Sequence, residues 1–583
     1  MSRTSSIQTV AANKDNHNRQ LHHLPNTVQP FHLAQAQAPQ QRHISAMSES
    51  IDANHIARAA AKGTLFSFLL RVLSFSLSQI TLRLVDATTL GKAAIQLELL
   101  LSTCLFLSRE GFRLALINAK NTSKDTSVEN VAWLSVPLGS IISMLILFLH
   151  HFYFSSESTG WDYQLAGSLY AVGALIECLS EPVLILTMRT LSVSDRAAAE
   201  GFAVLVKAIT TVLLLILTDS TYPISAFGLS QLAYGLTVTS TLYWRMWDRI
   251  RWPKKIVGDD GTYNESALQL FGKWPIDFET LRLVGTFTAQ GIFKHALTEG
   301  DKIVLSAVAD GYDQGVYAMT CSYGGLASRM LLQPLEENGR LLFALLKNTD
   351  DKNELRTCFV MLLKLVLYIG LFFVCIASNY TEVLLRILAG SRWANDDATE
   401  ALSAFCLYTG MLAINGMSEA FVYAVVSSNG EIGSLTFAHA TIGVVFAASA
   451  PLFVQKRGTI GLIAANSLQM LLRCIFSFRF AAQYFTRTLK STTSIRDLMR
   501  GFLPRGFVLF AFFVSYVATW YSKILFTSAT RHCPSIFDTV WVIASFKHIA
   551  VGLICISLVV ATALRAEYDL MRYVKSMRKV KTT

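Results

Sequence analysis

Two stretches, FKHALTEGDK at residues 293–302 and SRMLLQPLEENGR at residues 328–340, place eight charged side chains inside long apolar runs. These charged residues are Lys294, Glu299, Asp301, Lys302, Arg329, Glu336, Glu337 and Arg340. A charge at membrane depth costs roughly 2.5–3.5 kcal/mol even on the mildest scale. We therefore expect these side chains to face one another, a wet cavity or a charged substrate, which makes this region the strongest indication of function.

The surrounding sequence is typical of a polytopic membrane protein. Of its 583 residues, 52% are hydrophobic and 16% are charged, whereas a soluble protein carries about 25% charged residues. Apolar runs of about 20 residues recur from Thr64 to Ala563, and each could cross a hydrocarbon core of about 30 Å. Because barrel strands need only about 10 residues, the sequence predicts an all-α fold.

Run length and turn signals predict about fourteen membrane-spanning helices. They are expected near residues 64–84, 92–108, 131–152, 163–188, 198–218, 224–245, 282–309, 313–346, 357–377, 401–427, 434–455, 459–481, 503–527 and 538–564. Pro334 lies inside the eighth span, and we expect it to kink that helix because proline lacks a backbone N–H.

The spacing of these spans predicts two six-helix lobes around a central cavity, followed by a terminal helix pair. The expected parts are a disordered polar tail (1–57), a first lobe (58–246), a cytoplasmic linker loop (247–280), a second lobe (281–483), a basic cytoplasmic loop (484–502), the terminal pair (503–564) and a basic cytoplasmic tail (565–583). The polar tail is too poor in apolar residues to offset the entropy of ordering.

The distribution of basic residues predicts the orientation in the membrane. An even number of spans places both termini on one side, where the loops carry roughly 28 Lys and Arg residues against about 6 on the other. Both termini are therefore expected in the cytoplasm. The sequon at Asn379 then lies on the lumenal side, whereas those at Asn121 and Asn264 lie in the cytoplasm and should stay unmodified.

Several other classes of function find no support in the sequence. The nine cysteines are scattered without a CxxC pair, so neither a zinc site nor a disulfide framework is expected. The net charge of +11 is explained by basic cytoplasmic loops, so no nucleic-acid partner is expected. No Walker A motif is present. We expect no cofactor, and the oligomeric state is not predicted.

Several motifs closely resemble the Rft family of endoplasmic reticulum proteins, which are assigned to the translocation of Man5GlcNAc2-diphosphodolichol. The resemblance rests on FKHALTEGDK (293–302), DQGVY (313–317), SRMLLQPLEE (328–337), LFLSRE (105–110), WLSVPLG (133–139), Glu181-Pro182, LAING (412–416) with Glu419, and Ala465-Asn466 with Arg473. It covers residues 58 to 564 in order. It implies a membrane transporter of a lipid-linked oligosaccharide, and not an enzyme.

The Rft family is in turn similar to the MOP superfamily, which includes MurJ-type lipid II flippases and MATE exporters. That resemblance implies two six-helix lobes enclosing a cavity, with two added helices in MurJ-type members. Arg71 stands where MurJ-type proteins carry a cavity arginine in their first helix, and Arg329 stands similarly in the eighth. Both arginines are thereby implied to line the cavity.

A diphosphate headgroup must be neutralised when it leaves water, and the planar arginine fork suits phosphate oxygens. The candidate cavity or substrate-binding residues are Arg71, Arg329, Lys302, Glu299, Asp301, Gln333, Glu336, Glu337, Asn415 and Glu419, with Lys294 and Arg340 behind them. The alternative is that the basic groups merely pair with neighbouring acids. The i,i+4 spacing favours such a structural pair for Glu336 and Arg340, and places Gln333 beside Arg329.

Glu299, Lys302 and Lys294 are expected to form a self-neutralising patch on the seventh helix. Asp301 points elsewhere on that helix and is expected to pair with the eighth. Gly300 would permit close helix approach or local unwinding. Whether this patch is a gate that breaks during transport or a fixed brace stays open at this point.

Three further polar sets lie in the predicted spans. Glu177 and Glu181 are one helical turn apart and repel each other, so they need a cation, a proton, water or arginine partners, the last two being favoured. Glu110 and Arg113 are expected to form an ion pair near the headgroups. Asn415 and Glu419 are interpreted as a contact between helices in preference to a ligand site. Lys207 is expected to snorkel or to pair, and is assigned no role.

Three functions compete. The first is a glycolipid translocator whose lobes rock to expose the cavity alternately. The second is a dolichol-linked glycosyltransferase, which is disfavoured because the only lumenal loop of any length, 379–400, offers just Asp396-Asp397 and no supporting histidine or metal spacing. The third is an accessory or scaffold protein of the same pathway, which has little need of intramembrane charges. We favour the translocator.

Overall fold

The structure is a computed structural model that describes residues 73, 75–118, 130–154, 160–190, 192–250, 252, 267–270, 274–349, 351–489, 495–530, 533 and 535–568. All of them belong to one compact unit, Leu65–Thr583. Arg71, the polar tail 1–57 and the sequons at Asn121 and Asn264 lie outside the described residues, and the predictions made for them stay untested.

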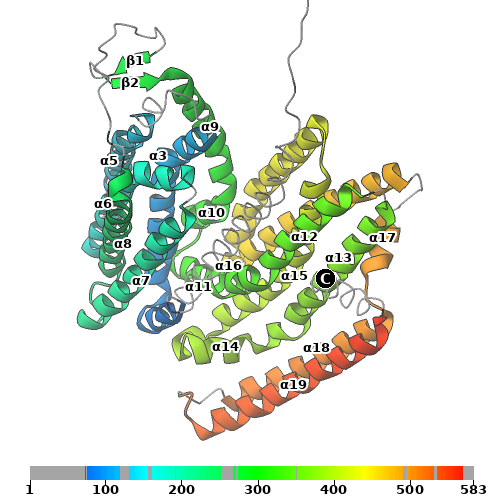
Figure 1. The fold of residues 1–583 in the computed structure, drawn as a ribbon. Helices are drawn as coiled ribbons and strands as arrows, with labels where there is room; N and C mark the ends of the chain where they lie inside the picture. The colour runs from blue at the N-terminus through cyan, green and yellow to red at the C-terminus, as the bar shows by residue number, and fades with distance from the viewer. Residues whose placement is uncertain are drawn as a thin grey trace, which may run out of the picture. The chain divides into compact units, whose positions relative to one another are not determined.

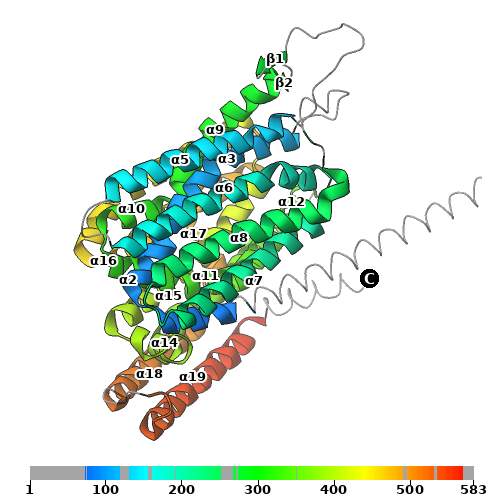
Figure 2. The ribbon, with the colours of Figure 1, turned by 90° about the vertical axis from the view of Figure 1, so that its left-hand side faces the viewer.

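The first half of the described chain, residues 75–246, is a bundle of helices (Figure 2). Residues 75–84 are helical. They are followed by α2 (Ala87–Gly91), the π-helix η1 (Lys92–Leu97), α3 (Glu98–Asn118), α5 (Ser135–Phe154), α6 (Trp161–Arg189), α7 (Val193–Leu217) and α8 (Pro223–Met246). Helix α6 packs against α3, α5 and α8, and side chains such as Leu97, Cys104 and Tyr170 form the buried core.

The predicted linker loop contains a short β-hairpin that the sequence analysis did not predict. A 3-10 turn (Trp247–Arg249) precedes it, and strands β1 (Ala267–Leu270) and β2 (Trp274–Asp277) pair antiparallel with Leu268 opposite Ile276. These strands are too short to give a periodic signal that stands out from the polar loop around them.

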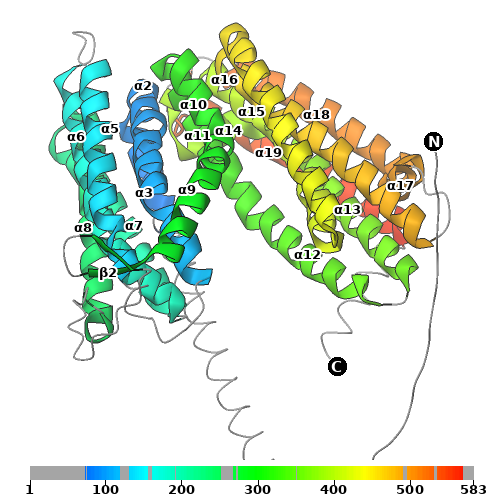
Figure 3. The same cartoon turned by 90° about the horizontal axis from the view of Figure 1, so that it is seen from above.

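The second half, residues 278–489, has the same helical character. Its elements are α9 (Phe278–Thr298), α10 (Gly300–Val308), α11 (Gly311–Ala327), the π-helix η3 (Ser328–Leu332), α12 (Gln333–Lys347), α13 (Lys352–Cys375), a 3-10 turn (Ala377–Tyr380), α14 (Thr381–Leu388), a second 3-10 turn (Ser391–Trp393), α15 (Asp396–Val425) and α16 (Asn429–Leu489). Figure 3 shows α9 beside α3, and α15 beside α16.

Helix α16 contains two of the predicted spans. The chain reverses at Arg457 and Gly458, where the backbone is not helical. Gly458 has φ +51°, a conformation that glycine adopts without the Cβ penalty of other residues. The predicted break between residues 455 and 459 is therefore confirmed.

Two irregularities interrupt the charged helices. The seventh predicted span divides at Glu299, which separates α9 from α10, so the local unwinding considered for Gly300 is present. The eighth span passes through the π-helical turn η3, which lies directly before Pro334 in the first turn of α12. The helix is thus irregular next to Pro334, in the form of a π turn, and the kink predicted there stays a prediction.

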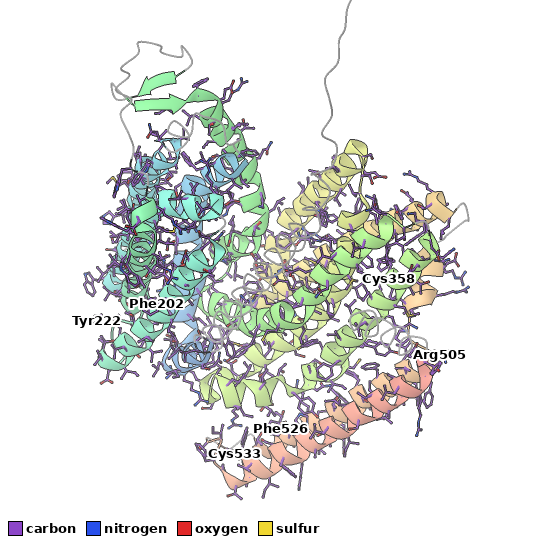
Figure 4. All side chains as sticks on the ribbon, viewed as in Figure 1. Phe202, Tyr222, Cys358, Arg505, Phe526 and Cys533 are labelled. Atoms are coloured by element: carbon purple, nitrogen blue, oxygen red, sulfur yellow. The ribbon has the colours of Figure 1, made fainter. Side chains whose placement is uncertain are left out.

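The chain ends in α17 (Ile495–Phe502) and the antiparallel pair α18 (Gly506–Thr530) and α19 (Thr539–Ala566), which lie side by side (Figure 1). Figure 4 marks Arg505 and Cys533 at opposite ends of α18. In the described part of the chain, nine helices are long and apolar enough to cross a membrane, one of them being the double-length segment Gly430–Leu489. The protein is therefore a multi-pass, all-helical membrane protein.

Successive spans alternate in direction, so the turns gather at two ends of the described unit. We call the end with residues 85–86, 218–222, 309–310 and 389–395 the Gly390 end. The end with the β-hairpin, residues 348–351 and 426–428 is the Trp247 end. Figure 1 shows α14 and the hairpin at these opposite ends.

Candidate functional site

A chain of polar side chains joins four helices inside the first half. Arg109 on α3 pairs with the buried Glu177 on α6 at 3.3 Å. Gln231 on α8 donates a hydrogen bond to Glu177 (2.8 Å), and Lys207 on α7 donates to Gln231 (2.6 Å). Lys207 also lies 3.7 Å from Glu98. Two cations thus balance two carboxylates in this network.

The second acid of α6 has its own arginine. Arg113 forms a two-pronged ion pair with Glu181, at 2.5 and 2.7 Å. The favoured interpretation of arginine partners for Glu177 and Glu181 is therefore confirmed. The predicted pair between Glu110 and Arg113 is wrong, because the guanidinium crosses to the neighbouring helix α6. Lys207 pairs, which is one of the two alternatives predicted for it, and its partners Gln231 and Glu98 come from other helices.

The Glu299–Lys302 ion pair is confirmed at 2.8 Å. Lys294 is exposed and takes no part in it, so the predicted three-residue patch is wrong. Lys294 and Glu299 are five positions apart, which places them on different sides of a helix with 3.6 residues per turn. The break at Glu299 separates them further.

Asp301 pairs with the eighth span as predicted, and its partner is a hydroxyl. Tyr317 on α11 donates a hydrogen bond to Asp301 (2.6 Å), and Asn466 on α16 donates to the Tyr317 hydroxyl (3.2 Å). Tyr317 is 3% exposed. The motifs at 293–302, 313–317 and 465–466 therefore meet in one hydrogen-bonded group.

The other residues of the DQGVY motif each hold a different element. Asp313 accepts hydrogen bonds from the backbone N–H (3.3 Å) and hydroxyl (3.1 Å) of Thr459, which follows the Gly458 turn. Gln314 donates to the carbonyl oxygen of Ala309 at the end of α10 (3.0 Å) and accepts from Gln96 of η1 (2.9 Å). This motif is a structural junction of α10, α11, α16 and η1.

Arg329 is exposed on the π turn η3. Within the described part of the chain, its guanidinium bonds only the carbonyl oxygen of Gly325, at 3.1 Å, and no carboxylate is within ion-pair distance. Gln333 donates instead to Glu337 (3.0 Å), so the expected contact with Arg329 is not formed. Arg329 therefore presents a guanidinium without an acidic partner among the described residues.

The predicted ion pair between Glu336 and Arg340 is wrong. The Arg340 guanidinium lies over the ring of Tyr423, 5.4 Å from its centroid. The Glu336 carboxylate packs directly on Gly416 of α15, where any larger residue would collide with it. Packing against α15 thus draws the two side chains apart, although their spacing would allow them to meet.

Asn415 and Glu419 both face α16, which agrees with the interpretation of a contact between helices. Glu419 lies 3.3 Å from His439 and 3.5 Å from Arg473. Asn415 is buried with its amide oxygen 4.0 Å from the Cys474 sulfur. His439 was not singled out, because one histidine in an apolar run carries no signal of its own.

Two cavities accompany these charges. One of about 410 Å³ lies between α13, α18 and α19 and is almost wholly apolar; Leu331, Phe372, Phe512, Val560 and Leu564 are among its lining residues. The other, of about 520 Å³, is lined by residues including Gln96, Thr103, His150, Tyr163 and Ser306. In the described ranges no cluster of three His, Cys, Asp or Glu could hold a metal ion.

The last span is fastened by a buried acid just beyond its end. Glu567, 3% exposed in its side chain, accepts a hydrogen bond from Lys364 of α13 (2.8 Å) and one from the backbone N–H of Arg505 (3.0 Å). Burial alone would raise the pKa of this carboxyl, but these two donors outweigh it and lower the pKa below its ordinary value.

Comparison with known sequences gives a consistent family. The sequence model of a family described as "Rft protein" matches residues 57–577. The Man(5)GlcNAc(2)-PP-dolichol translocation protein RFT1 of Schizosaccharomyces pombe is 30% identical over 492 residues, which cover 80% of this chain and 90% of that protein. The Mus musculus protein of the same name is 27% identical over 541 residues, covering 89% and 96%.

Solved structures show the same fold at low sequence identity. The lipid II flippase MurJ in an inward closed conformation has a TM-score of 0.54 at 13% identity, covering 85% of this chain and 98% of MurJ. An inward-facing MATE transporter of the MOP superfamily has a TM-score of 0.53 at 13% identity, covering 73% and 96%. The fold is thus similar to that of MurJ and MATE transporters. Because the family model spans nearly the whole sequence, this chain belongs to the Rft family.

Proposed function

We propose that this protein translocates Man5GlcNAc2-diphosphodolichol from the cytoplasmic to the lumenal leaflet of the endoplasmic reticulum membrane. The relatives named above support the substrate, and the MurJ-like fold supports a transporter in place of an enzyme. The observation that carries the proposal is Arg329, an exposed arginine in the eighth predicted span with no carboxylate partner among the described residues. Such a cation would otherwise be costly at this depth.

The proposed architecture has about fourteen spans, grouped as two six-helix lobes (58–246 and 281–483) and a terminal pair (503–564). Both termini lie in the cytoplasm, which puts the Trp247 end on the cytoplasmic side. Arg329 binds the diphosphate through its planar fork. Arg71, Lys302 and the acids around them line the same wet cavity.

The apolar cavity of about 410 Å³ supports a role for the terminal helix pair in holding the lipid chain. Leu331, two residues after Arg329, lines the cavity together with α13, α18 and α19. A polyisoprenyl chain is chemically suited to such a lining, so the chain can stay in an apolar setting while Arg329 holds the headgroup. This arrangement needs no covalent chemistry.

The competing hypothesis is an accessory protein that supports the pathway without moving lipid, since a fold does not fix a function. Reconstitution separates the two. Purified protein in vesicles with labelled Man5GlcNAc2-diphosphodolichol should accelerate crossing, measured by access of a headgroup-reactive reagent. No acceleration by a folded preparation would contradict direct translocation.

The Arg329 variants test the carrying observation. Arg329→Ala should lower the translocation rate by 10-fold or more, because one charge-assisted hydrogen bond contributes about 1.5–3 kcal/mol. Arg329→Lys should recover only part of it, since an ammonium lacks the fork. Arg282→Ala, at an exposed arginine of α9, is the control and should leave the rate unchanged. If Arg329→Ala instead lowers protein level, the residue is a brace.

A further inference from the structure

At the Gly390 end, a side chain from the first half caps a helix of the second. Arg83 donates hydrogen bonds from Nε to the carbonyl oxygen of Leu388 (3.1 Å) and from Nη2 to that of Ile387 (2.5 Å). These carbonyls belong to the last turn of α14, where helical donors are lacking. A cation at a helix C-terminus also meets the negative end of its dipole.

Side chains of the second half likewise donate hydrogen bonds to helix-end carbonyl oxygens of the first half. Trp393, 2% exposed, donates its indole N–H to the carbonyl oxygen of Leu82 (2.7 Å). Arg392 donates to the carbonyl oxygen of Leu84 (3.5 Å). Both carbonyls lie in the last turn of the helix at 75–84. Each half therefore caps a helix end of the other, and we call these four donor–carbonyl contacts the capping latch.

A second contact lies next to the capping latch. Gly91 faces the carbonyl oxygen of Gly311, and Gly315 faces that of Ala87, so closely that an added Cβ would overlap either oxygen. Farther from the Gly390 end, the Gln96 side-chain amide donates a hydrogen bond to the side-chain oxygen of Gln314. Because glycine has no side chain, the backbones of residues 87–91 and 311–315 can touch.

The hydrogen bonds between described residues of 75–250 and 311–489 all lie toward the Gly390 end. Besides the capping latch and Gln96–Gln314, the deepest is Tyr323 donating to Gln79 (2.5 Å). Toward the Trp247 end the first half contacts α9 instead, as where Thr103 meets His295 (3.1 Å). Helix α10, beyond the break at Glu299, packs mainly on α16 and also contacts η1 of the first half.

We infer that the capping latch and the adjoining glycine contact are a gate that closes the Gly390 end and must part for that end to open. This inference rests on the proposed function in one respect: translocation requires the Gly390 end to open. The donor–carbonyl contacts lie beside an apolar core that both halves share, in which Leu82 and Val85 of the first half cluster with Trp393 of the second, so opening this end must also part that core. We place the hinge at the break at Glu299, because α9 packs on α3, whereas α10 packs mainly on α16.

The gate is tested by a distance across it. Spin labels at Asp86→Cys and Ser391→Cys, both exposed positions, are introduced into a cysteine-free chain and measured by double electron–electron resonance. The unaltered latch should give mainly one short distance. Arg83→Ala with Trp393→Phe removes three of the four donor contacts yet keeps an aromatic ring in the buried site. This variant should shift at least a third of the population to longer distances.

Arg457→Ala, an exposed arginine at the same end but outside the latch, is the matched control and should leave the distances unchanged. An unchanged distribution in a folded Arg83→Ala/Trp393→Phe protein overturns the gate. If that variant does not fold, Arg83→Gln alone is measured, with the same two outcomes at smaller amplitude.

The measurement needs no lipid substrate, so its failure differs from failure of the proposed function. A protein that moves glycolipid in vesicles while its latch distance never changes contradicts the gate and leaves translocation standing. A latch that opens in the variant, in a protein that moves no glycolipid, supports the gate and contradicts translocation.

Discussion

At the scale of residues, the two halves use charge differently. In the first half, Glu177 and Glu181 are each satisfied by an arginine of α3. In the second half, Arg329 has no acidic partner among the described residues, and Arg340 lies over an aromatic ring. The balanced pairs of the first half leave no net charge for a coupling cation, so they are best explained as braces between helices.

The Arg113–Glu181 pair gives a residue-scale prediction. Glu181→Ala should destabilise the protein by about 3–5 kcal/mol, because it leaves the largely buried Arg113 guanidinium, 16% exposed, without its partner. Replacing both partners, as Arg113→Met with Glu181→Leu, should recover most of the loss. Thermal unfolding in detergent, followed by size-exclusion chromatography, measures the order of stability.

The exposed pair Arg196–Glu200, at 2.8 Å, is the control for this prediction. Glu200→Ala should change stability by less than about 1 kcal/mol, since solvent screens the pair. Equal losses from Glu181→Ala and Glu200→Ala would show that burial of the Arg113–Glu181 pair has no energetic weight.

At the scale of elements, the segment after α13 fastens the terminal helix pair. Asn379 is 5% exposed, and its amide donates to the Thr519 hydroxyl of α18 (3.0 Å). Tyr380 stacks on His548 of α19, with ring centroids 4.1 Å apart, and donates to its carbonyl oxygen (2.9 Å). A sequon that looks like a lumenal glycan acceptor is thus part of a buried helix contact.

This element-scale packing predicts that Asn379 carries no glycan. Glycosidase treatment should leave the electrophoretic mobility of the protein unchanged, because the folded contact leaves no room for a sugar. Asn379→Gln should lower the unfolding temperature, since an unpaired buried hydroxyl or amide costs about 1–3 kcal/mol. A mobility shift on treatment would contradict both statements.

At the scale of the whole molecule, the described unit is held together by junctions far apart in sequence, and one of them responds to pH. The pKa of Glu567 is lowered in the folded protein by Lys364 and the Arg505 backbone N–H. A lowered pKa stabilises the fold above the unfolded-state pKa, and this stability is lost as pH falls through the folded pKa. Attachment of α19 should therefore weaken below about pH 4.3.

The pH dependence can be measured as the unfolding temperature between about pH 6 and 3. The unaltered protein should lose stability toward the acidic limit more steeply than Glu567→Gln, which has no proton to bind. Glu567→Gln should also be less stable near neutral pH, because the Lys364 ammonium then lacks its anion. Parallel curves would contradict the assignment to Glu567.

Much of this whole-molecule arrangement could be predicted from sequence, since span positions follow from apolar run length. The Glu299–Lys302 pair was also within reach, because i,i+3 neighbours meet on any helix. The partners of Arg113 and Glu336 were not, because α6 and α15 supply them. Local spacing cannot show which neighbouring helix a side chain will face.

The capping latch has a consequence for how the protein tolerates mutation. Its acceptors are main-chain oxygens of Leu82, Leu84, Ile387 and Leu388. Those four positions can drift among apolar side chains over evolutionary time without loss of a single latch bond. The latch bonds depend instead on the identity of the donor side chains, above all Arg83 and Trp393. Harmful variants at this end of the molecule should therefore concentrate on the donor positions and spare their acceptors.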